Sequence, residues 1–383
     1  MKIYFDHSAT TQADSRAVKE MIPYMIQKYG NPSSLHQKGL EAKKALDGAR
    51  KQIADFINAN DEEIIFTSGG TESDNLAIKG VITKEKNHII TSVIEHPAIL
   101  DTCKRLEMEG IRISYIPVDK NGIINLKKLE KEITKNTAIV SIMHANNEIG
   151  TIQPIEGIGK ICRKKRVYFH TDAVQTFGKI KIDVSKMNID LLSASSHKIY
   201  GPKGVGLLYI RKGVKINPIL NGGGQEFGKR SGTVNVAGII GFSKAVQLCK
   251  KTMEREQNEL LEIRNYLIEK ISKIKYAKLN GHKTKRLCGN INFCFGGVEG
   301  EALVMLLSQK GIYASTGSAC SSKSLEPSHV LTAIGLAPED AHGSLRISLG
   351  RGNTLKQAGY LIKILPKIIE KLRRMNPLYE KEN

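Results

Sequence analysis

The stretch LLSASSHKIYGPKGVGLLYI, residues 191–210, places a lysine between two predicted strands. The leucines at its start open the first strand, and the small residues 193–196 would let a ring or a phosphate approach the backbone closely. Residues 200–204 are typical of a turn, and the apolar run 205–210 predicts a second, buried strand. The lysine, Lys198, is therefore expected at the end of a core strand.

Burial would strip water from the Lys198 ammonium and lower its pKa, which makes the neutral amine available for Schiff-base chemistry. Lys203 follows five residues later and is an equally basic alternative. Most lysines are simply solvated, so the spacing does not choose between these two or exclude a plain surface loop. The choice depends on the other motifs.

Length and composition indicate a globular protein of about two domains. The chain has 383 residues, of which 40% are hydrophobic and 25% charged. Lys and Arg outnumber Asp and Glu by 58 to 38, giving a net charge of +20, but no long block of like charge occurs and only 5% of residues are aromatic. This pattern disfavours nucleic-acid binding as the main role and fits an anionic cofactor or an acidic protein partner.

The N-terminal sequence MKIYFDHSATT lacks the continuous apolar core of a signal peptide, and no apolar run reaches membrane-spanning length. We therefore expect a cytoplasmic protein without a membrane role. The six cysteines show neither a C-x-x-C pair nor a metal-ligand spacing; they lie at 103, 162, 249, 288, 294 and 320. Free and mostly buried thiols are expected.

Apolar strands alternate with amphipathic helices through the first two thirds of the chain. Strands are predicted at 63–67, 88–93, 112–118, 138–144 and 167–172, and helices at 39–59, after 71, and at 98–109, 126–133 and 155–165. Strands separated by such helices form a mainly parallel sheet covered on both faces. Ligands of such sheets bind at the carboxyl ends of the strands.

A long helix at about 236–274 is expected to join two domains. Beyond it the pattern predicts strands at 290–295, 312–315 and 344–349, with helices at 299–309 and after 354. We predict an α/β domain over residues 15–250, and a smaller α+β domain formed by residues 1–14 and 251–383.

The motif TSGGTESDN, residues 67–75, follows a strand and begins a helix. Its backbone N–H groups at Gly70 and Thr71 can bind a phosphate, which the positive end of the helix dipole favours. Thr71 and Asp74 equally suit a capping box, and the carboxylates of Glu72 and Asp74 would repel an anion. Both interpretations stay open.

The motif YFHTDAVQ, residues 168–175, puts Asp172 at the end of a predicted central strand. A carboxylate beside a pyridine nitrogen keeps that nitrogen protonated and makes the ring an electron sink. A lone aspartate at a strand end is often only a helix cap. The nearby lysine and phosphate motif favour the cofactor role.

Cys320 lies within YASTGSACSSKSLEP, residues 313–327, among small residues that pack poorly. An exposed thiol near Lys323 would ionise readily and act as a nucleophile on a moving loop. A chance surface cysteine is the alternative.

Seven motifs together resemble the cysteine desulfurases that supply sulfur for iron-sulfur clusters. They are TSGGTESDN, HANNEIG (144–150), HTDAVQ (170–175), SSHKIYGPKG (195–204), GGGQEFGKRSGT (222–233), STGSACSSKSLEPSHVL (315–331) and SLRISLGR (344–351). The resemblance runs from FDHSATT at 5–11 to the final helix. It implies the fold type I of pyridoxal-phosphate (PLP) transferases, with a mainly parallel seven-stranded sheet in the large domain.

The resemblance implies roles for matching residues. Lys198 would form the Schiff base with PLP, His96 would stack on its ring and Asp172 would pair with its nitrogen. The remaining contacts implied are Gln175 and Asn147 at the hydroxyl side of the ring, Gly70, Thr71, Ser195 and His197 at the phosphate, and Thr233 reaching the phosphate from a second subunit of a homodimer. Arg346, Asn31 and Asn147 would bind the substrate.

The implied reaction takes sulfur from L-cysteine, leaving L-alanine and a persulfide on Cys320 in the small domain. The sulfur would pass to an iron-sulfur scaffold protein or another acceptor. No resident metal is implied, and Cys320 as a transient cluster ligand stays open. The alternatives are an aminotransferase or other lyase on the same fold, which has no use for Cys320, and a basic module that binds no cofactor.

Overall fold

The computed structural model describes residues 2–317 and 327–376, and its centre is a seven-stranded sheet. The strand order is β2-β8-β7-β6-β5-β3-β4. In chain order these strands are β2 (Ile64–Thr67), β3 (His88–Ser92), β4 (Arg112–Ile116), β5 (Thr137–Ser141), β6 (Tyr168–Asp172), β7 (Leu191–Ser195) and β8 (Gly206–Ile210). Strand β8 is antiparallel to both neighbours and the other pairs are parallel, so the predicted mainly parallel sheet is confirmed.

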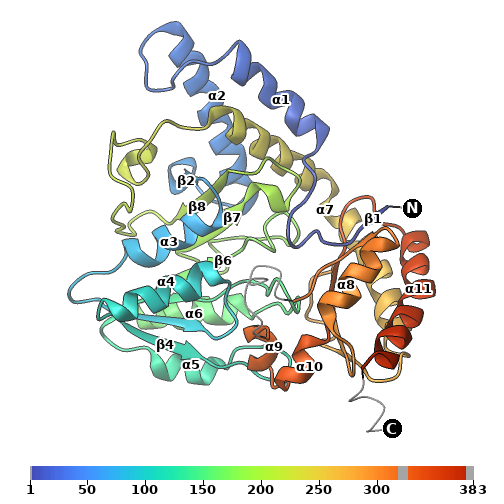
Figure 1. The fold of residues 1–383 in the computed structure, drawn as a ribbon. Coiled ribbons are helices and arrows are strands. Elements are labelled where there is room, and N and C mark those ends of the chain that lie inside the picture. The colour runs from blue at the N-terminus through green and yellow to red at the C-terminus, as the bar shows by residue number, and fades with distance from the viewer. Residues whose placement is uncertain (1, 318–326, 377–383) are drawn as a thin grey trace.

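Helices cover both faces of this sheet (Figure 1). One face packs against α2 (Gln37–Ile57), α5 (Leu126–Glu132), α6 (Ile155–Lys165) and the start of α7 (Val236–Ile271), and the other against α3 (Gly70–Gly80) and α4 (Pro97–Met108). Neighbouring strand residues divide between the two cores, Ile64 and Phe66 facing one and Ile65 the other. This division follows from the two-residue period of a strand buried on both sides.

A second body is built around β9 (Ala277–Leu279), β10 (Asn290–Phe295) and β12 (Ser344–Ser348), an antiparallel sheet. It also contains α8 (Gly300–Gln309), β11 (Ile312–Tyr313), α9 (His329–Ala333), α10 (Pro338–His342) and α11 (Leu355–Arg374). The N-terminal strand β1 (Ile3–Tyr4) pairs with β11, and Figure 1 shows β1 close to α8 and α11. Helix α7 contributes to the cores of both bodies, because its first half packs under the large sheet and Ile263, Leu267 and Ile271 pack with β10.

Helix α1 (Ser15–Ile26) was absent from the sequence-based predictions, as were α9 and α10. Pro23 lies inside α1, and a proline in a helix interior normally argues against a helix. Asp14 nevertheless caps it by accepting from the backbone of Arg16. The predicted strand at 312–315 is shorter than expected, since β11 ends at Tyr313 and Ser315 forms an isolated bridge with Arg346.

Among the described helices, none combines the length and apolar character needed to cross a membrane.

Candidate active site

The carboxyl ends of β2, β6 and β7 meet at one edge of the large sheet. Strand β2 is antiparallel to β8, which is antiparallel to β7, so β2 and β7 run the same way. The motifs that follow β2 and β7 and the aspartate that ends β6 therefore share this edge. This is where an open α/β sheet binds ligands.

Lys198 ends a short 3₁₀ turn that directly follows β7, Ser196–Lys198. Its Nζ donates to the carbonyls of Ser8 at 2.6 Å and Ala9 at 2.7 Å, so the amine reaches across to the N-terminal segment. Lys203, the alternative in the sequence, is exposed. The geometry therefore favours Lys198 as the amine of this site.

Asp172 is buried at the end of β6, where its Oδ1 accepts from the backbone N–H of Val174 at 2.8 Å. Burial raises the pKa of Asp172, while the nearby His96 and Lys198 pull it down. His96 caps α4 by accepting from the backbone of Ala98 through Nδ1 at 3.1 Å. Burial lowers the pKa of His96, so its ring is neutral near pH 7 with the proton on Nε2.

The turn after β2 brings the start of α3 against β7. A Cβ at Gly70 would lie 2.8 Å from Val174 Cγ2 and 4.0 Å from Ser195 Cβ, so the backbone here is as close to its neighbours as glycine allows. Thr71 follows Gly70 in the first turn of the helix. The first N–H groups of α3 have no partner within the helix, and the positive end of the helix dipole lies at the same place.

The capping-box interpretation of Thr71 and Asp74 is wrong, because the cap of α3 is Gly69. Glu72 instead pairs with Arg230 at 2.8 Å, and Asp74 is fully buried with its pKa raised well above the usual range by burial and by Asp172. One carboxylate is therefore paired with an arginine, and burial favours the protonated form of the other. Both effects weaken the repulsion of an anion that the sequence suggested.

The N-terminal segment, residues 5–11, forms a wall of the site that the residue patterns did not reveal. Thr10 Oγ1 lies 3.0 Å from His197 Nδ1, and Thr11 donates to the carbonyl of His197 at 2.8 Å. Gln175 Nε2 donates to the carbonyl of Ser8 at 3.0 Å, the same carbonyl that accepts from Lys198. Most of these hydrogen bonds are made to main-chain carbonyls. Because any residue has such a carbonyl, the sequence pattern does not reveal them.

Arg346 lies on β12 of the second body with a largely buried side chain. Its Nη2 pairs with Asp6 Oδ1 at 3.0 Å, and its Nη1 donates to the carbonyl of Asn147 at 3.3 Å. Asn147 follows β5 in the loop HANNEIG. The structure thus brings two predicted substrate contacts together and adds Asp6, which the sequence did not single out.

Two predicted contacts lie apart from this group. Asn31 is exposed in the connection between α1 and α2, where its Oδ1 accepts from the backbone of Ser33 at 3.0 Å. Thr233 is exposed in the long connection between β8 and α7. Cys320, the predicted sulfur acceptor, lies outside the described residues. The five cysteines that the structure describes are free thiols, and four of them are buried, as predicted.

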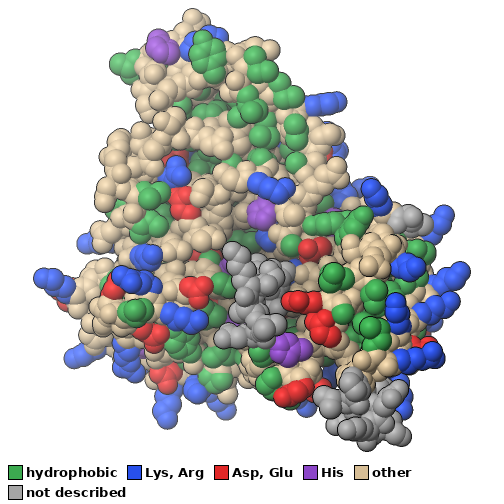
Figure 2. All heavy atoms as spheres, viewed as in Figure 1, with side chains coloured by type: hydrophobic (Ala, Val, Ile, Leu, Met, Phe, Trp, Pro, Cys, Tyr) green, Lys and Arg blue, Asp and Glu red, His purple; other side chains and the backbone are tan. Residues whose placement is uncertain are grey.

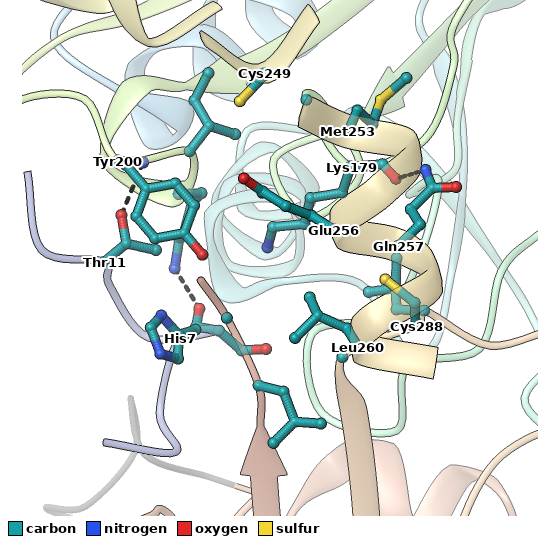
Figure 3. A pocket seen from close by; sticks show the side chains of 18 of the residues that line it. His7, Thr11, Lys179, Tyr200, Cys249, Met253, Glu256, Gln257, Leu260 and Cys288 are labelled. Carbon is teal, nitrogen blue, oxygen red and sulfur yellow. Dashed lines mark hydrogen bonds between the residues drawn. The ribbon is translucent and has the colours of Figure 1, made fainter. Parts of the chain in front are cut away.

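A cavity of about 40 Å³ adjoins Lys198, between the N-terminal segment, the loop after β6 and α7 (Figure 3). The side chain of Lys179 points into it, with Cys249 and Cys288 on its walls. Burial lowers the pKa of Lys179. This space holds a few water molecules and is too small for a pyridine ring with its phosphate.

The residues at the sheet edge fit a phosphorylated pyridine cofactor. Asp172 offers a buried carboxylate for a ring nitrogen, and Gly70 offers a backbone that a phosphate can approach. Gln175 Oε1 is buried and has no hydrogen-bond partner among the described residues, which leaves an acceptor free for a ligand hydroxyl. No group of three His, Cys, Asp or Glu side chains within residues 2–317 and 327–376 is arranged to hold a metal ion.

Comparison with known proteins agrees with this geometry. Residues 3–361 match the aminotransferase class-V family, whose members use PLP. The chain is 53% identical over 383 residues to the cysteine desulfurase IscS of Methanosarcina thermophila, covering 99% of this chain and 95% of that protein.

Two solved structures are also similar. A NifS-like protein superposes with a TM-score of 0.91 at 41% identity, covering 97% of this chain and 100% of that one. A structure described as SspA in complex with cysteine gives a TM-score of 0.82 at 40% identity, covering 91% of this chain and 99% of that one. The chain belongs to the class-V aminotransferase family, and within it to the cysteine desulfurases of the IscS type.

Proposed function

We propose that this protein is a PLP-dependent cysteine desulfurase in which Lys198 binds the cofactor and Cys320 receives the sulfur. The observation that carries the proposal is the convergence of the Lys198 amine, the buried Asp172 carboxylate and the Gly70 turn at one sheet edge. L-cysteine and a cysteine thiol would be converted to L-alanine and a persulfide. One C–S bond breaks and one S–S bond forms, so no outside oxidant is needed.

The bound cofactor supplies an electron sink for the carbanion that forms at the substrate α-carbon. Asp172 would hold the proton of its ring nitrogen, and a buried carboxylate facing a cation favours that pairing. His96, neutral near pH 7, would contact the ring without adding charge. Gly70, Thr71, Ser195 and His197 would surround the phosphate, with Gln175 and Asn147 on the hydroxyl side.

Lys198 would also move the substrate α-proton once its amine is released. Its two carbonyl acceptors, on Ser8 and Ala9, hold the amine at the sheet edge and orient it. The same oriented amine could therefore accept a proton in one step and return it in another.

Arg346 would bind the substrate carboxylate as a bidentate fork, assisted by Asn147. The side chain is largely buried and already oriented by the carbonyl of Asn147. Asp6 Oδ1 accepts from one of its Nη atoms. The substrate carboxylate would therefore compete with a carboxylate of the protein.

We propose a homodimer in which Thr233 of each chain reaches the phosphate of the other. An apolar surface on α1 and the connection that follows supports this proposal. Figure 2 shows hydrophobic side chains at this upper end of the molecule. The exposed large hydrophobic residues here are Val18, Ile22, Met25, Ile26, Tyr29 and Leu35. A monomer rarely exposes so many neighbouring apolar groups. Light scattering should give twice the chain mass, and half that mass for an Ile22→Lys/Ile26→Lys variant.

We also propose that an iron-sulfur scaffold protein, or another sulfur acceptor, takes the persulfide sulfur in the cytoplasm. The net charge of +20 suits an acidic partner. The free thiols among the described cysteines suit a reducing compartment.

We further propose that the two domains divide after residues 14 and 250. Helix α7 crosses the second of these boundaries and contributes to both cores.

The experiment that tests this function is an absorption spectrum of the purified protein before and after L-cysteine is added, with alanine quantified. A cofactor band that changes on addition, followed by alanine and a bound persulfide, is the expected result. A changing band without alanine would indicate an aminotransferase or another lyase on the same fold. A protein that lacks the cofactor band and does not gain it when PLP is added would exclude PLP chemistry.

A further inference from the structure

Glu148 lies where the described chain on both sides of residues 318–326 comes together. Ser328 Oγ donates to Glu148 Oε2 at 2.5 Å. Gly317 packs against the same oxygen, since a Cβ at this position would lie 2.7 Å from Oε2. One carboxylate oxygen therefore contacts the last described residue before Cys320 and a residue just after the undescribed stretch.

The backbone of Glu148 is fixed from two directions. Its N–H donates to Asn146 Oδ1 at 2.8 Å, within the loop after β5. Its carbonyl accepts from Asn290 Nδ2 at 3.2 Å and from Asn292 Nδ2 at 3.3 Å, both on β10 of the second body. Glu148 is only 5% exposed. The carboxylate is therefore held at a set position relative to both bodies.

The same network reaches the predicted substrate arginine. The carbonyl of Asn147, the neighbour of Glu148, accepts from Arg346 Nη1 at 3.3 Å. Ser315, two residues before Gly317, exchanges both backbone hydrogen bonds with Arg346, at 3.2 and 2.7 Å. The chain that leads toward Cys320 and the group that would hold the substrate carboxylate thus share one set of contacts.

We propose that Glu148 is a positioning residue for sulfur transfer, which fixes Gly317 and Ser328 at one point beside Arg346. By doing so it sets the distance between Arg346 and both ends of the segment that carries Cys320. This inference rests on the proposed function, because it assigns the role through Cys320. Misplacing a reacting group by about 1 Å can cost on the order of 100-fold in rate, so shifting the points where this segment begins and ends is expected to slow the transfer step.

A purely structural glutamate is the competing explanation, and the step that fails in a variant separates the two roles. Burial raises the pKa of Glu148 to about 7, against the opposing effects of Ser328 and Arg346, so the carboxyl is not strongly stabilised as an anion. An amide in its place can still accept from Ser328. A positioning role therefore tolerates Glu148→Gln and not Glu148→Ala, and it affects the transfer of sulfur and not the binding of cofactor.

The test uses the full-length PLP-loaded enzyme and follows two steps in a single turnover. Stopped-flow absorption reports the change on mixing with L-cysteine, and quenched samples report persulfide and alanine. The variants are Glu148→Ala, Glu148→Gln, Ser328→Ala and the Glu148→Ala/Ser328→Ala double variant. Glu63→Ala is the matched control, because Glu63 is also a buried glutamate but lies at the amino end of β2, the opposite edge of the sheet.

For Glu148→Ala we expect an unchanged cofactor spectrum and an initial absorption change within about twofold of wild type, with persulfide formation slowed at least ~10-fold. Glu148→Gln should stay within about threefold, and the double variant should be no slower than Glu148→Ala, as expected for residues that act through one contact. Glu63→Ala should transfer sulfur at the wild-type rate.

Wild-type persulfide formation in Glu148→Ala would overturn the inference and leave the proposed function intact. Equal loss of cofactor binding and sulfur transfer in Glu148→Ala would also overturn it, since that is the result of a structural role. Absence of alanine from the wild-type enzyme would instead refute the proposed function itself.

Discussion

Arg346 Nη2 lies 3.0 Å from Asp6 Oδ1, so an ion pair joins β12 to the N-terminal segment at the point where the substrate carboxylate is expected. The arginine side chain is 3% exposed and the aspartate side chain 20%. If Arg346 binds the substrate carboxylate, as we propose, Asp6 competes with the substrate for Nη2 and weakens substrate binding.

Asp6→Asn should lower the KM for L-cysteine by roughly two- to fivefold with little change in kcat, because a partly exposed ion pair contributes at most about 1 kcal/mol. Steady-state alanine production measures both constants. Glu20→Gln, which removes a surface pair with Lys244, is the control and should change neither. A higher KM in Asp6→Asn would show that Asp6 orients Arg346 and does not compete with substrate.

Gly70→Ala should weaken PLP binding at least ~5-fold, because the added methyl would lie 2.8 Å from Val174 and overpacking of this kind costs about 1–3 kcal/mol. Titration of the cofactor-free protein with PLP measures the affinity. Gly48→Ala is the matched control: nothing lies within 4 Å of its added Cβ on the exposed side of α2. That variant should bind PLP normally and gain about 0.5–1 kcal/mol of stability.

The free energy of unfolding should depend on pH through the buried carboxyl of Glu95. Burial raises its pKa to about 8, against hydrogen bonds from Ser92 at 2.5 Å and from the backbone of Met143. A carboxyl whose pKa is higher in the folded state stabilises the fold fully below its unfolded pKa near 4.5, and this contribution is lost as pH rises toward 8.

Glu95→Gln should therefore remove a pH-dependent loss that approaches 1.4 kcal/mol per pH unit between about pH 5 and 8. Urea unfolding of wild type and variant across this range measures the difference. Parallel stability curves for the two proteins would mean that Glu95 is ionised in the folded state.

Lys198→Ala should lose the absorption band of the bound cofactor and all alanine production, whereas Lys203→Ala should keep both. The reason is geometric, since Lys198 points to the sheet edge and Lys203 to solvent. Spectra of the two variants with added PLP decide the matter. Full activity in Lys198→Ala would move the role to another amine.

The sequence predicted the large sheet well because its strands are buried on both faces and leave continuous apolar runs, as in β3 and β5. It also placed Asp172 and Lys198 at strand ends, where a parallel sheet gathers its ligand contacts. It missed α1, whose interior Pro23 and exposed apolar side chains obscure the helical pattern.

Two parts of the site were beyond a pattern-based prediction for a different reason. Ser8 and Ala9 act through backbone carbonyls, so their side chains give no sign of the contact with Lys198. Glu148 is defined by contacts with Gly317 and Ser328, which are about 170 and 180 residues away in sequence. Such contacts depend on the packing of the two bodies and not on local periodicity.

The most direct test of the account is mass analysis of the peptide that contains Cys320 after the PLP-loaded enzyme has reacted with L-cysteine. The account predicts that the peptide gains the mass of one sulfur atom, that one alanine appears for each sulfur gained, and that Cys320→Ser retains the cofactor band but yields neither. Alanine released at the wild-type rate by Cys320→Ser, or sulfur found on a different cysteine, would contradict it.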